Sequence, residues 1–295
     1  MALRGPPEDR SPAELLSFGV LNLDKPPGPS AHQVAAWVRD LATVERAAHA
    51  GTLDPKVTGC LPMLLGDATR MAQVFDDSDK EYVAVLELHE RLADSSALDA
   101  VADEFEGEIY QKPPKKSAVV RRLRSREIHR LDVLEAEDRR ALLSIRCESG
   151  TYIRKLCHDM GLALGTGAHM GDLRRAATDP FDDADLVTMH DFVDALAWWR
   201  EDDDPDPLRE VVQPAERALV DLPSVTIAPS AAESVAEGAP IYAPGVIDAD
   251  DDLDPATEPL VACYIPNGAA VCLGTLAGDP DADEGTVVEL ERVLV

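Results

Sequence analysis

The chain has 295 residues and a mass of 31.8 kDa, which is more than one compact domain usually holds, so we expect a larger and a smaller domain. Hydrophobic residues make up 45% of the sequence, which favours an ordinary globular protein and excludes a disordered or fibrous one. Charges near the N-terminus argue against a signal peptide, and no apolar run is long enough to cross a membrane. We therefore expect a soluble, cytoplasmic protein with no membrane partner.

The formal net charge of −28 is the strongest feature of the composition. Asp and Glu are spread along the whole chain, which favours a protein that works in concentrated salt, where repulsion between surface carboxylates is screened. Binding of cations or basic partners is the alternative interpretation. Five cysteines without a C-x-x-C pair indicate neither a disulfide framework nor a zinc ribbon, so we expect them to be small buried side chains.

The first part of the chain alternates strand and helix patterns. Ser30 is predicted to cap a helix whose apolar residues recur with helical spacing at Val34, Trp37, Val38 and Leu41. The loop around His49 follows the end of this helix. Strand patterns cover residues 18–24, 82–90 and 141–147, and one short helix covers residues 98–105.

A further helix is predicted after the sequence S-G-T at residues 149–151, with one apolar face formed by Ile153, Leu156, Met160 and Leu164. This spacing places Arg154 in the first turn of the helix. Arg154 and His158 lie one turn apart and point away from the apolar face.

The character of the chain changes at residues 201–210, an acidic stretch broken by proline that we interpret as the connection between two domains. Beyond about residue 218 the pattern consists of short strands, and Asn267-Gly268 between two apolar runs predicts a hairpin turn. The acidic tract at residues 248–255 lacks the glycine and the final glutamate of a calcium loop, so we interpret it as a surface loop.

One segment of this acidic chain is strongly basic. Residues 112–130 hold eight Lys or Arg and a single acid, Glu127, and a second net-positive region spans residues 139–175. A basic run is usually a solvated face or a flexible arm, but in a chain otherwise rich in acids it favours a polyanionic ligand, most commonly nucleic acid. The candidate RNA-binding residues are Lys112, Lys115, Lys116, Arg121, Arg122 and Arg124.

The residues alone offer five candidates for a site: Asp54, His49, Tyr82, Arg154 and Lys155. None is specific by itself, because a loop Asp near glycines is most often a turn former and an Arg at a helix start is most often a surface charge. Taken this far, the sequence indicates a soluble α/β protein that binds a polyanion.

The order of the motifs adds a resemblance to a known family. N-L-D-K-P-P-G-P-S, H-A-G-T-L-D-P-K-V-T-G-C-L, K-E-Y-V, P-P-x-x-S-A-V-x-R-x-L-R and E-S-G-T-Y-I-R-K-L-C-x-D-x-G occur in that order between residues 22 and 161. Together they resemble the TruB and dyskerin family of pseudouridine synthases, over roughly residues 18–295. The spelling G-A-H-M-G-D-L-R-R at residues 167–175 is the form of the archaeal and eukaryotic branch.

The resemblance implies an α+β fold, in which a mixed, mainly antiparallel sheet forms the catalytic domain and a small β-barrel-like PUA domain that binds RNA follows. The expected divisions are an N-terminal extension at 1–17, the catalytic domain at 18–210 and the PUA domain at 211–295. The implied reaction detaches a uridine in RNA at N1, rotates the base and rejoins it to the ribose through C5. It implies no cofactor and no metal.

The resemblance also assigns three catalytic residues. Asp54 is the carboxylate that attacks C1′ or takes the 2′ proton, and one carboxylate suffices because no water needs activation. Arg154 is implied to hold Asp54 charged and oriented in a largely dehydrated pocket. Tyr82 matches the tyrosine that stacks on the flipped base and helps remove the C5 proton.

Four further residues are expected to bind the substrate. Leu173 matches an apolar residue that lines the pocket, and His49 matches the histidine that helps extrude the base, a step costing a few kcal/mol. Lys25 and Lys155, which lie in the matching motifs, complete the expected substrate contacts.

The branch of the family follows from a missing insertion. The chain runs from Ser117 into L-D-V-L-E at 131–135 without the long insertion with which bacterial enzymes grip tRNA, so we favour the archaeal branch guided by box H/ACA RNA. Expected partners are guide RNA, rRNA and tRNA, a small zinc-ribbon core protein, a Gar-type protein and a kink-turn-binding ribosomal protein. Guide-free modification of uridine-55 in the T-loop of tRNA stays open.

Two other functions compete with this prediction. A non-catalytic RNA-binding scaffold would keep the PUA domain and the basic surface, but it would not need Asp54, Tyr82 and Arg154. An RNA glycosidase would need a second acid near Asp54, and the local sequence offers none.

Overall fold

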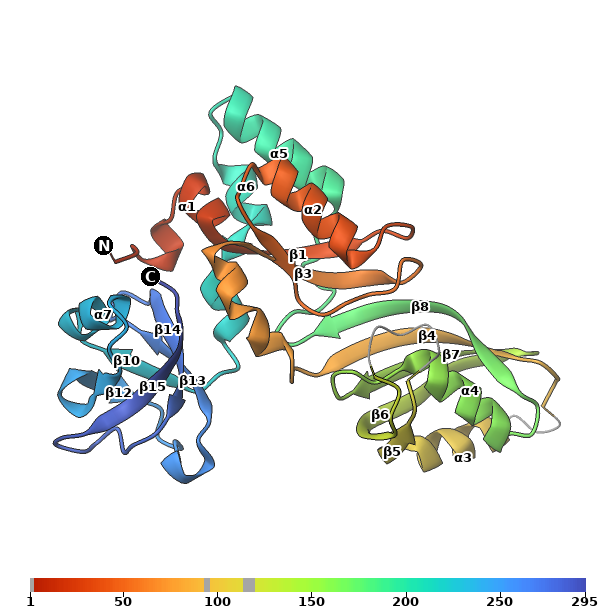
Figure 1. Cartoon of the computed structure of the whole chain (residues 1–295). Coiled ribbons are helices and arrows are strands. Elements are labelled where there is room, and N and C mark those ends of the chain that lie inside the picture. The colour runs from red at the N-terminus through yellow and green to blue at the C-terminus, as the bar shows by residue number, and fades with distance from the viewer. Residues whose placement is uncertain (1–2, 93–95, 114–119) are drawn as a thin grey trace.

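The computed structural model describes residues 3–92, 96–113 and 120–295, which form two β-sheets with helices packed around them (Figure 1). The first sheet has nine strands in the order β5-β6-β7-β4-β8-β3-β1-β9, with β2 paired to β3. Neighbouring strands in this sheet are antiparallel, except that β3 and β8 pair in parallel. The strands are β1 (Phe18–Lys25), β2 (Ala47–His49), β3 (Thr58–Gly66), β4 (Lys80–Leu88), β5 (Gly107–Gln111), β6 (Arg124–Glu137), β7 (Arg140–Cys147), β8 (Ala168–Thr178) and β9 (Gln213–Pro214).

Helices cover this first sheet, and several begin at a residue suited to the position. Ser11, Ser30 and Thr188 each close a capping box, which satisfies free N–H groups at the helix start. Val34 and Val38 of α2 are buried, whereas Trp37 lies at the border of the apolar face and is 46% exposed. The helices are α1 (Pro12–Ser17), α2 (Ala31–Ala42), α3 (Ser96–Phe105), α4 (Ile153–Ala163), α5 (Met189–Glu201) and α6 (Asp206–Val211), with 3-10 turns η1 (Pro7–Asp9), η2 (Asp67–Phe75) and η3 (Ala215–Leu219).

The second sheet has six strands in the order β11-β15-β14-β13-β10-β12. Its two edge strands are joined only by the short turn η4 (Ala243–Gly245), so the sheet curls into a barrel-like shape that α7 (Pro229–Ala236) covers. The predicted hairpin at Asn267-Gly268 joins β13 to β14. The strands are β10 (Ser224–Ile227), β11 (Ile241–Tyr242), β12 (Val246–Ala249), β13 (Leu260–Tyr264), β14 (Ala270–Leu276) and β15 (Thr286–Val293), and η5 (Pro255–Thr257) lies between β12 and β13.

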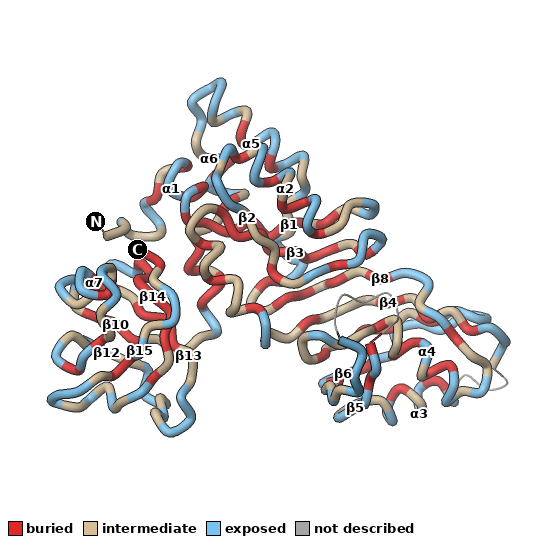
Figure 2. The backbone as a smooth tube through the Cα atoms, viewed as in Figure 1, coloured by how far each residue is buried: buried red, intermediate tan, exposed pale blue. Residues whose placement is uncertain are grey.

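The two sheets share apolar packing. Figure 2 shows buried residues along β1 and β3 and again in the strands of the second sheet. Phe18 and Val20 of β1 belong to one cluster with Leu273 and Leu294 of the second unit. Beside this cluster, the buried guanidinium of Arg10 donates to both carboxylate oxygens of Glu216, at 2.7 and 2.6 Å. Glu216 also accepts from the N–H of Ala270 in β14 at 3.0 Å, so Arg10 and Glu216 link the N-terminal segment to the second sheet.

Several sequence predictions are confirmed by these elements. The strands expected at 18–24, 82–90 and 141–147 correspond to β1, β4 and β7, and the helix expected at 98–105 corresponds to α3. All five cysteines are free and buried. Within the described residues, no helix has both the length and the apolar character needed to span a membrane.

The expectation that residues 201–210 connect two domains is wrong. Glu201 ends α5, and Leu208 of α6 is buried in the main core of the first unit. The expected divisions 1–17, 18–210 and 211–295 stay predictions. β9, at Gln213–Pro214, still pairs with β1, and the second sheet begins at Ser224.

Candidate active site

A cleft of about 450 Å³ opens where the Asp54 loop, the start of α4 and the strands β4 and β8 meet. Of the expected site residues, it brings together Asp54, Tyr82, Arg154 and Leu173. The lining residues are Gly51, Thr52, Leu53, Asp54, Val57, Lys80, Tyr82, Ser149, Gly150, Thr151, Tyr152, Ile153, Arg154, Leu173 and Arg175.

Asp54 lies in the loop between β2 and β3, on one wall of the cleft. The Val57 N–H donates to the Asp54 carbonyl at 3.0 Å, and the Gly28 N–H donates to the Pro55 carbonyl at 2.8 Å. These bonds fix the loop as a turn against the end of β1. Buried Leu53 and Val57 anchor it on both sides of the exposed carboxylate.

Arg154 faces Asp54 from the opposite wall, in the first turn of α4. Its Nη2 lies 2.8 Å from Oδ2 of Asp54, which confirms the predicted place of Arg154 at a helix start and brings the two residues together. The Asp54 side chain is 50% exposed and that of Arg154 is 37% exposed. The ion pair is therefore partly exposed, and the expectation of a largely dehydrated pocket around it is wrong.

Tyr82 and Leu173 lie between the two walls, on the adjacent strands β4 and β8. Ala84 pairs with Leu173 and Tyr82 pairs with Arg175, so the antiparallel register places both side chains in the cleft. Burial raises the pKa of the Tyr82 phenol, and the neighbouring Arg175 opposes this shift. Tyr82 is therefore a neutral phenol at neutral pH.

Two buried basic residues in the cleft, Arg175 and Lys80, were not assigned a role from the sequence. Arg175 is 1% exposed, and its Nε and Nη2 donate to the carbonyls of Cys60 and Ala50 at 2.7 and 3.2 Å. Lys80 is 4% exposed, and its Nζ donates to the Phe75 carbonyl at 2.9 Å and to the carbonyl and hydroxyl of Ser78. Burial lowers the pKa of Lys80 to about 8, and the positive charge of Arg175 contributes to this shift.

Close packing explains one glycine beside these bases. Gly59 has a φ of +97°, and a Cβ at this position would lie 2.2 Å from the Arg175 carbonyl oxygen. Only glycine allows β3 to approach β8 closely enough to place the Arg175 side chain beneath the Asp54 loop.

Lys25 is placed differently from the expected substrate contact. Its side chain is fully buried, and Nζ donates to the carbonyls of Pro26, Pro55 and Val57 at 3.0, 3.1 and 2.8 Å. These bonds use all three donors of the ammonium, so none is left for a substrate. Burial lowers the pKa of Lys25, and the negative charge of Asp54 opposes this shift. Lys25 holds the Asp54 loop in place.

His49 and Lys155 are not among the residues that line the cleft. His49 ends β2, close to the Asp54 loop, and burial lowers the pKa of its imidazole. Lys155 pairs with Asp159 one turn along α4. Their expected contacts with the substrate stay predictions.

The basic segment, residues 112–130, follows the last residue of β5 and continues into β6. Lys112, Arg121 and Arg122 are exposed, and Arg124 is half-buried at the first position of β6. Arg121 donates from Nε to the Pro113 carbonyl at 2.9 Å. Lys115 and Lys116 lie outside the described residues, so the RNA contact of this segment stays a prediction.

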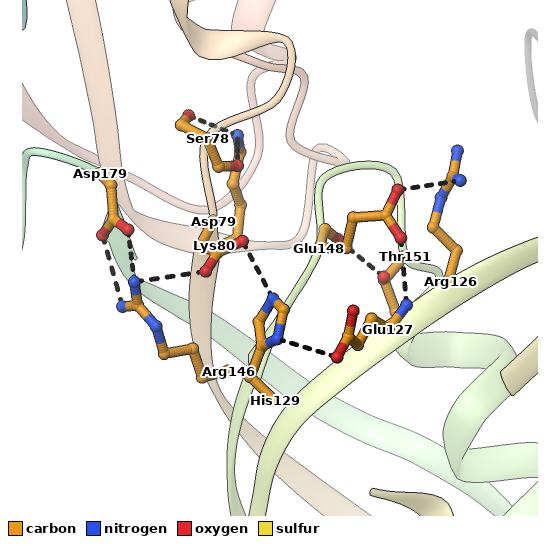
Figure 3. Close-up of polar contacts among 10 residues, drawn as sticks. All are labelled: Ser78, Asp79, Lys80, Arg126, Glu127, His129, Arg146, Glu148, Thr151 and Asp179. Carbon is orange, nitrogen blue, oxygen red and sulfur yellow. Dashed lines mark hydrogen bonds and ion pairs between the residues drawn. The ribbon is translucent and has the colours of Figure 1, made fainter. Parts of the chain in front are cut away.

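Figure 3 shows a group of ion pairs that joins His129 of β6 and Arg146 of β7 to Asp79, just before β4, and Asp179, just after β8. Asp79 accepts from His129 Nε2 at 3.1 Å and lies 3.5 Å from Nη2 of Arg146, which also pairs with Asp179. These contacts link the start of β4, where Lys80 lies, to β6.

Among the described residues, no group of three or more His, Cys, Asp or Glu is placed to hold a metal ion.

Four family profiles match the chain. The TruB family pseudouridylate synthase N-terminal domain matches residues 39–153, and the tRNA pseudouridylate synthase B C-terminal domain matches residues 154–220. The DKCLD domain matches residues 5–35 and the PUA domain matches residues 223–294.

Relatives and solved structures agree with these matches. A protein named probable tRNA pseudouridine synthase B from Halobacterium salinarum is 66% identical to this chain, and the alignment covers 100% of both proteins. A protein of the same name from Haloarcula marismortui is 67% identical, and the alignment covers 100% of this chain and 94% of the relative. A crystal structure of a Cbf5-Nop10-Gar1 complex matches with 42% identity and a TM-score of 0.93, covering 99% of this chain and 90% of the other. A structure of an H/ACA RNP bound to a substrate RNA containing 2′-deoxyuridine matches with 40% identity and a TM-score of 0.91, with the same coverage.

The motifs that carry Asp54, Tyr82 and Arg154 thus meet in one cleft of a fold that matches these proteins over nearly its whole length. The chain belongs to the TruB family of pseudouridine synthases and carries a C-terminal PUA domain.

Proposed function

We propose that this protein isomerises uridine to pseudouridine in RNA, with Asp54 as the catalytic carboxylate. The observation that carries the proposal is the 2.8 Å ion pair between Asp54 and Arg154 above Tyr82 and Leu173 in a single cleft. A non-catalytic scaffold does not need this arrangement. A glycosidase of the usual type needs two carboxylates, and Asp54 is the one acid among the described residues that line the cleft.

Three cleft residues, Asp54, Arg154 and Tyr82, have a part in the proposed reaction. As the bond from C1′ to N1 breaks, positive charge develops at C1′, and the Asp54 carboxylate either attacks this carbon or removes the neighbouring 2′ proton. The cation of Arg154 keeps Asp54 ionised and oriented. After the base turns, C5 bonds to C1′ as the bond from Asp54 to C1′ breaks or, on the second route, as the 2′ carbon regains its proton. C5 then loses its proton to solvent, and N1 takes one up. The raised pKa of Tyr82 supports a neutral phenol that stacks on the base, and argues against a tyrosinate as the base that takes this proton.

We further propose that the protein works as the catalytic subunit of a box H/ACA particle in the cytoplasm, with guide RNA selecting uridines in rRNA. Support comes from matches of 39–42% identity to solved H/ACA complexes, two of which name Nop10 as a partner and one Gar1. Gar1 corresponds to the expected Gar-type partner, whereas the zinc-ribbon and kink-turn-binding proteins stay predictions. The names of the curated relatives support a second substrate, tRNA.

The acidic composition fits this proposal. The two relatives from halophiles share about two thirds of their residues with this chain, which supports function in concentrated salt. Under those conditions counterion release adds less to RNA affinity, so contacts by shape, stacking and hydrogen bonds gain importance.

Mapping of pseudouridine with the purified protein in molar salt tests the choice of substrate. The reactions contain tRNA alone, rRNA fragments alone, and rRNA fragments with guide RNA and the two partner proteins. We expect modification of rRNA only with the guide, together with guide-free modification of tRNA uridine-55. Modification restricted to tRNA under all conditions would contradict the guided role, and no modification of either RNA would contradict the proposed reaction.

A further inference from the structure

The helix that carries Arg154 begins without a cap of its own. Tyr152 is the N-cap residue of α4, and its side chain makes no capping hydrogen bond. Arg154 is the second residue of this helix, so any shift of the first turn moves its guanidinium relative to Asp54. The position of this turn therefore depends on contacts from outside the helix.

Gln111, the last residue of β5, supplies two of these bonds. Its side-chain Oε1 accepts from the Tyr152 N–H at 2.9 Å, and its Nε2 donates to the Tyr152 carbonyl at 3.2 Å. Gln111 is only 2% exposed and is not among the residues that line the cleft. The primary amide thus pairs with the backbone of Tyr152 as a neighbouring strand would.

Glu148 holds the start of the segment that leads into α4, as Figure 3 shows. One carboxylate oxygen lies 3.2 Å from Nη1 of Arg126, and the other accepts from the Glu127 N–H at 3.1 Å. Between the two anchors, Gly150 has a φ of +78°, and a Cβ there would lie 3.1 Å from Nη2 of Arg126. The rim segment, residues 148–152, therefore lies directly against the β5–β6 hairpin.

We propose that Gln111 and Glu148 are positioning residues, which hold Arg154 against Asp54 by fixing the rim segment to the β5–β6 hairpin. Neither residue lines the cleft, so both act through the backbone at residues 148–152. This inference rests on the proposed function, because it takes the Asp54–Arg154 pair as the catalytic centre. It adds that the geometry of this pair is set from β5 and β6, outside the cleft.

The first test is Gln111→Met, which keeps the side-chain length and removes both bonds to Tyr152. We expect the single-turnover rate of pseudouridine formation at saturating RNA to fall about 10- to 100-fold, the range for a small misplacement of a catalytic group. The RNA Kd should change less than about twofold, because every side chain that lines the cleft is kept. Tyr110→Phe is the control on β5, since it removes only the contact of an exposed hydroxyl with Glu108, and its rate should match that of the wild type.

The second test is the pH profile of Gln111→Glu. An ionised Glu at this position accepts from the Tyr152 N–H but repels the Tyr152 carbonyl, whereas a protonated Glu regains the missing donor. The rate of this variant relative to wild type should therefore rise as the pH falls. A residue that only supports the fold would give the same relative rate at every pH. Such a flat ratio would overturn the role of Gln111.

Glu148 provides an independent test if the Gln111 variants do not fold. Glu148→Ala should lower the single-turnover rate about tenfold, and Glu148→Gln, which keeps an acceptor for the Glu127 N–H, should recover most of the loss. An unchanged rate in Glu148→Ala, or losses confined to RNA Kd, would overturn the inference. Failure of the proposed function is distinguishable, because the wild-type protein would then form no pseudouridine.

Discussion

The two walls of the cleft are held in different ways. On the Asp54 wall, the fully buried ammonium of Lys25 bonds to three backbone carbonyls. On the Arg154 wall, the neutral amide of Gln111 and the partly exposed carboxylate of Glu148 do the corresponding work. Salt screens an exposed ion pair much more than a buried one. In concentrated salt the Asp54 wall therefore keeps a charged anchor, while the Arg154 wall depends mainly on its uncharged hydrogen bonds.

The residues that hold the two walls differ from the residues that take part in the reaction. Asp54 and Arg154 meet at 2.8 Å, although each is fixed by a side chain that lies outside the cleft lining. Loss of an anchor should shift the geometry of the pair, whereas loss of a pair member should remove its charge. The following changes are ordered by the size of the effect that we expect.

Apart from the loss of Asp54 itself, replacement of Arg154 by Met should have the largest effect. Without its partner Asp54 is no longer oriented, and we expect the single-turnover rate to fall about 100- to 1,000-fold, as for other preorganised charged contacts. Arg154→Lys keeps the charge but not the planar donor set, so it should recover only part of the rate. Quench-flow measurement of product at saturating RNA checks both variants. A rate near that of the wild type in Arg154→Met would show that Asp54 is oriented from its own wall alone.

Lys80, between the two walls, should make stability depend on pH. Its pKa is lowered to about 8 in the folded protein from 10.5, so between these pH values the unfolded chain still binds the proton that the folded chain has released. The folded state should therefore gain stability, by about 3 kcal/mol, as pH rises through this window. Urea unfolding at pH 8 and pH 10.5 checks this against Lys80→Met, which lacks the titrating group. A constant difference between the two proteins would contradict it.

Lys25→Met tests the anchor of the Asp54 wall. The three carbonyls lose their donor but the cost of burying a charge is also removed, so we expect a net loss of about 2 kcal/mol in unfolding free energy. The Asp54 loop should shift, with a rate about tenfold lower. Urea unfolding and single-turnover kinetics measure the two effects. If stability falls while the rate is unchanged, Lys25 supports the fold without positioning Asp54.

Local patterns predicted the elements that carry the site. The helical spacing after residue 151 placed Arg154 correctly in a first turn, and the Ser30 cap and the Asn267-Gly268 turn were also predicted correctly. These features depend on neighbours within a few residues. The family resemblance then brought Asp54 and Arg154 together, which no local pattern indicates because they are a hundred positions apart.

The parts that the sequence did not reveal depend on backbone carbonyls that only the folded chain brings to these side chains. Lys25, Lys80 and Arg175 are charged residues that would ordinarily be exposed, and they are buried because carbonyls accept their donors. The carbonyl that holds Arg175 belongs to Cys60, 115 positions away. Likewise, residues 201–210 read as a linker by composition, but Leu208 is buried against a core that composition does not show.

The most direct test of the central claim is Asp54→Asn, assayed on RNA labelled with tritium at C5 of uridine. The label is released when C5 bonds to C1′, so release reports the complete isomerisation. We predict no detectable release by Asp54→Asn at saturating RNA, with RNA Kd within about twofold of the wild type because the cleft keeps its shape. Release at the wild-type rate would contradict the assignment of Asp54 as the catalytic carboxylate.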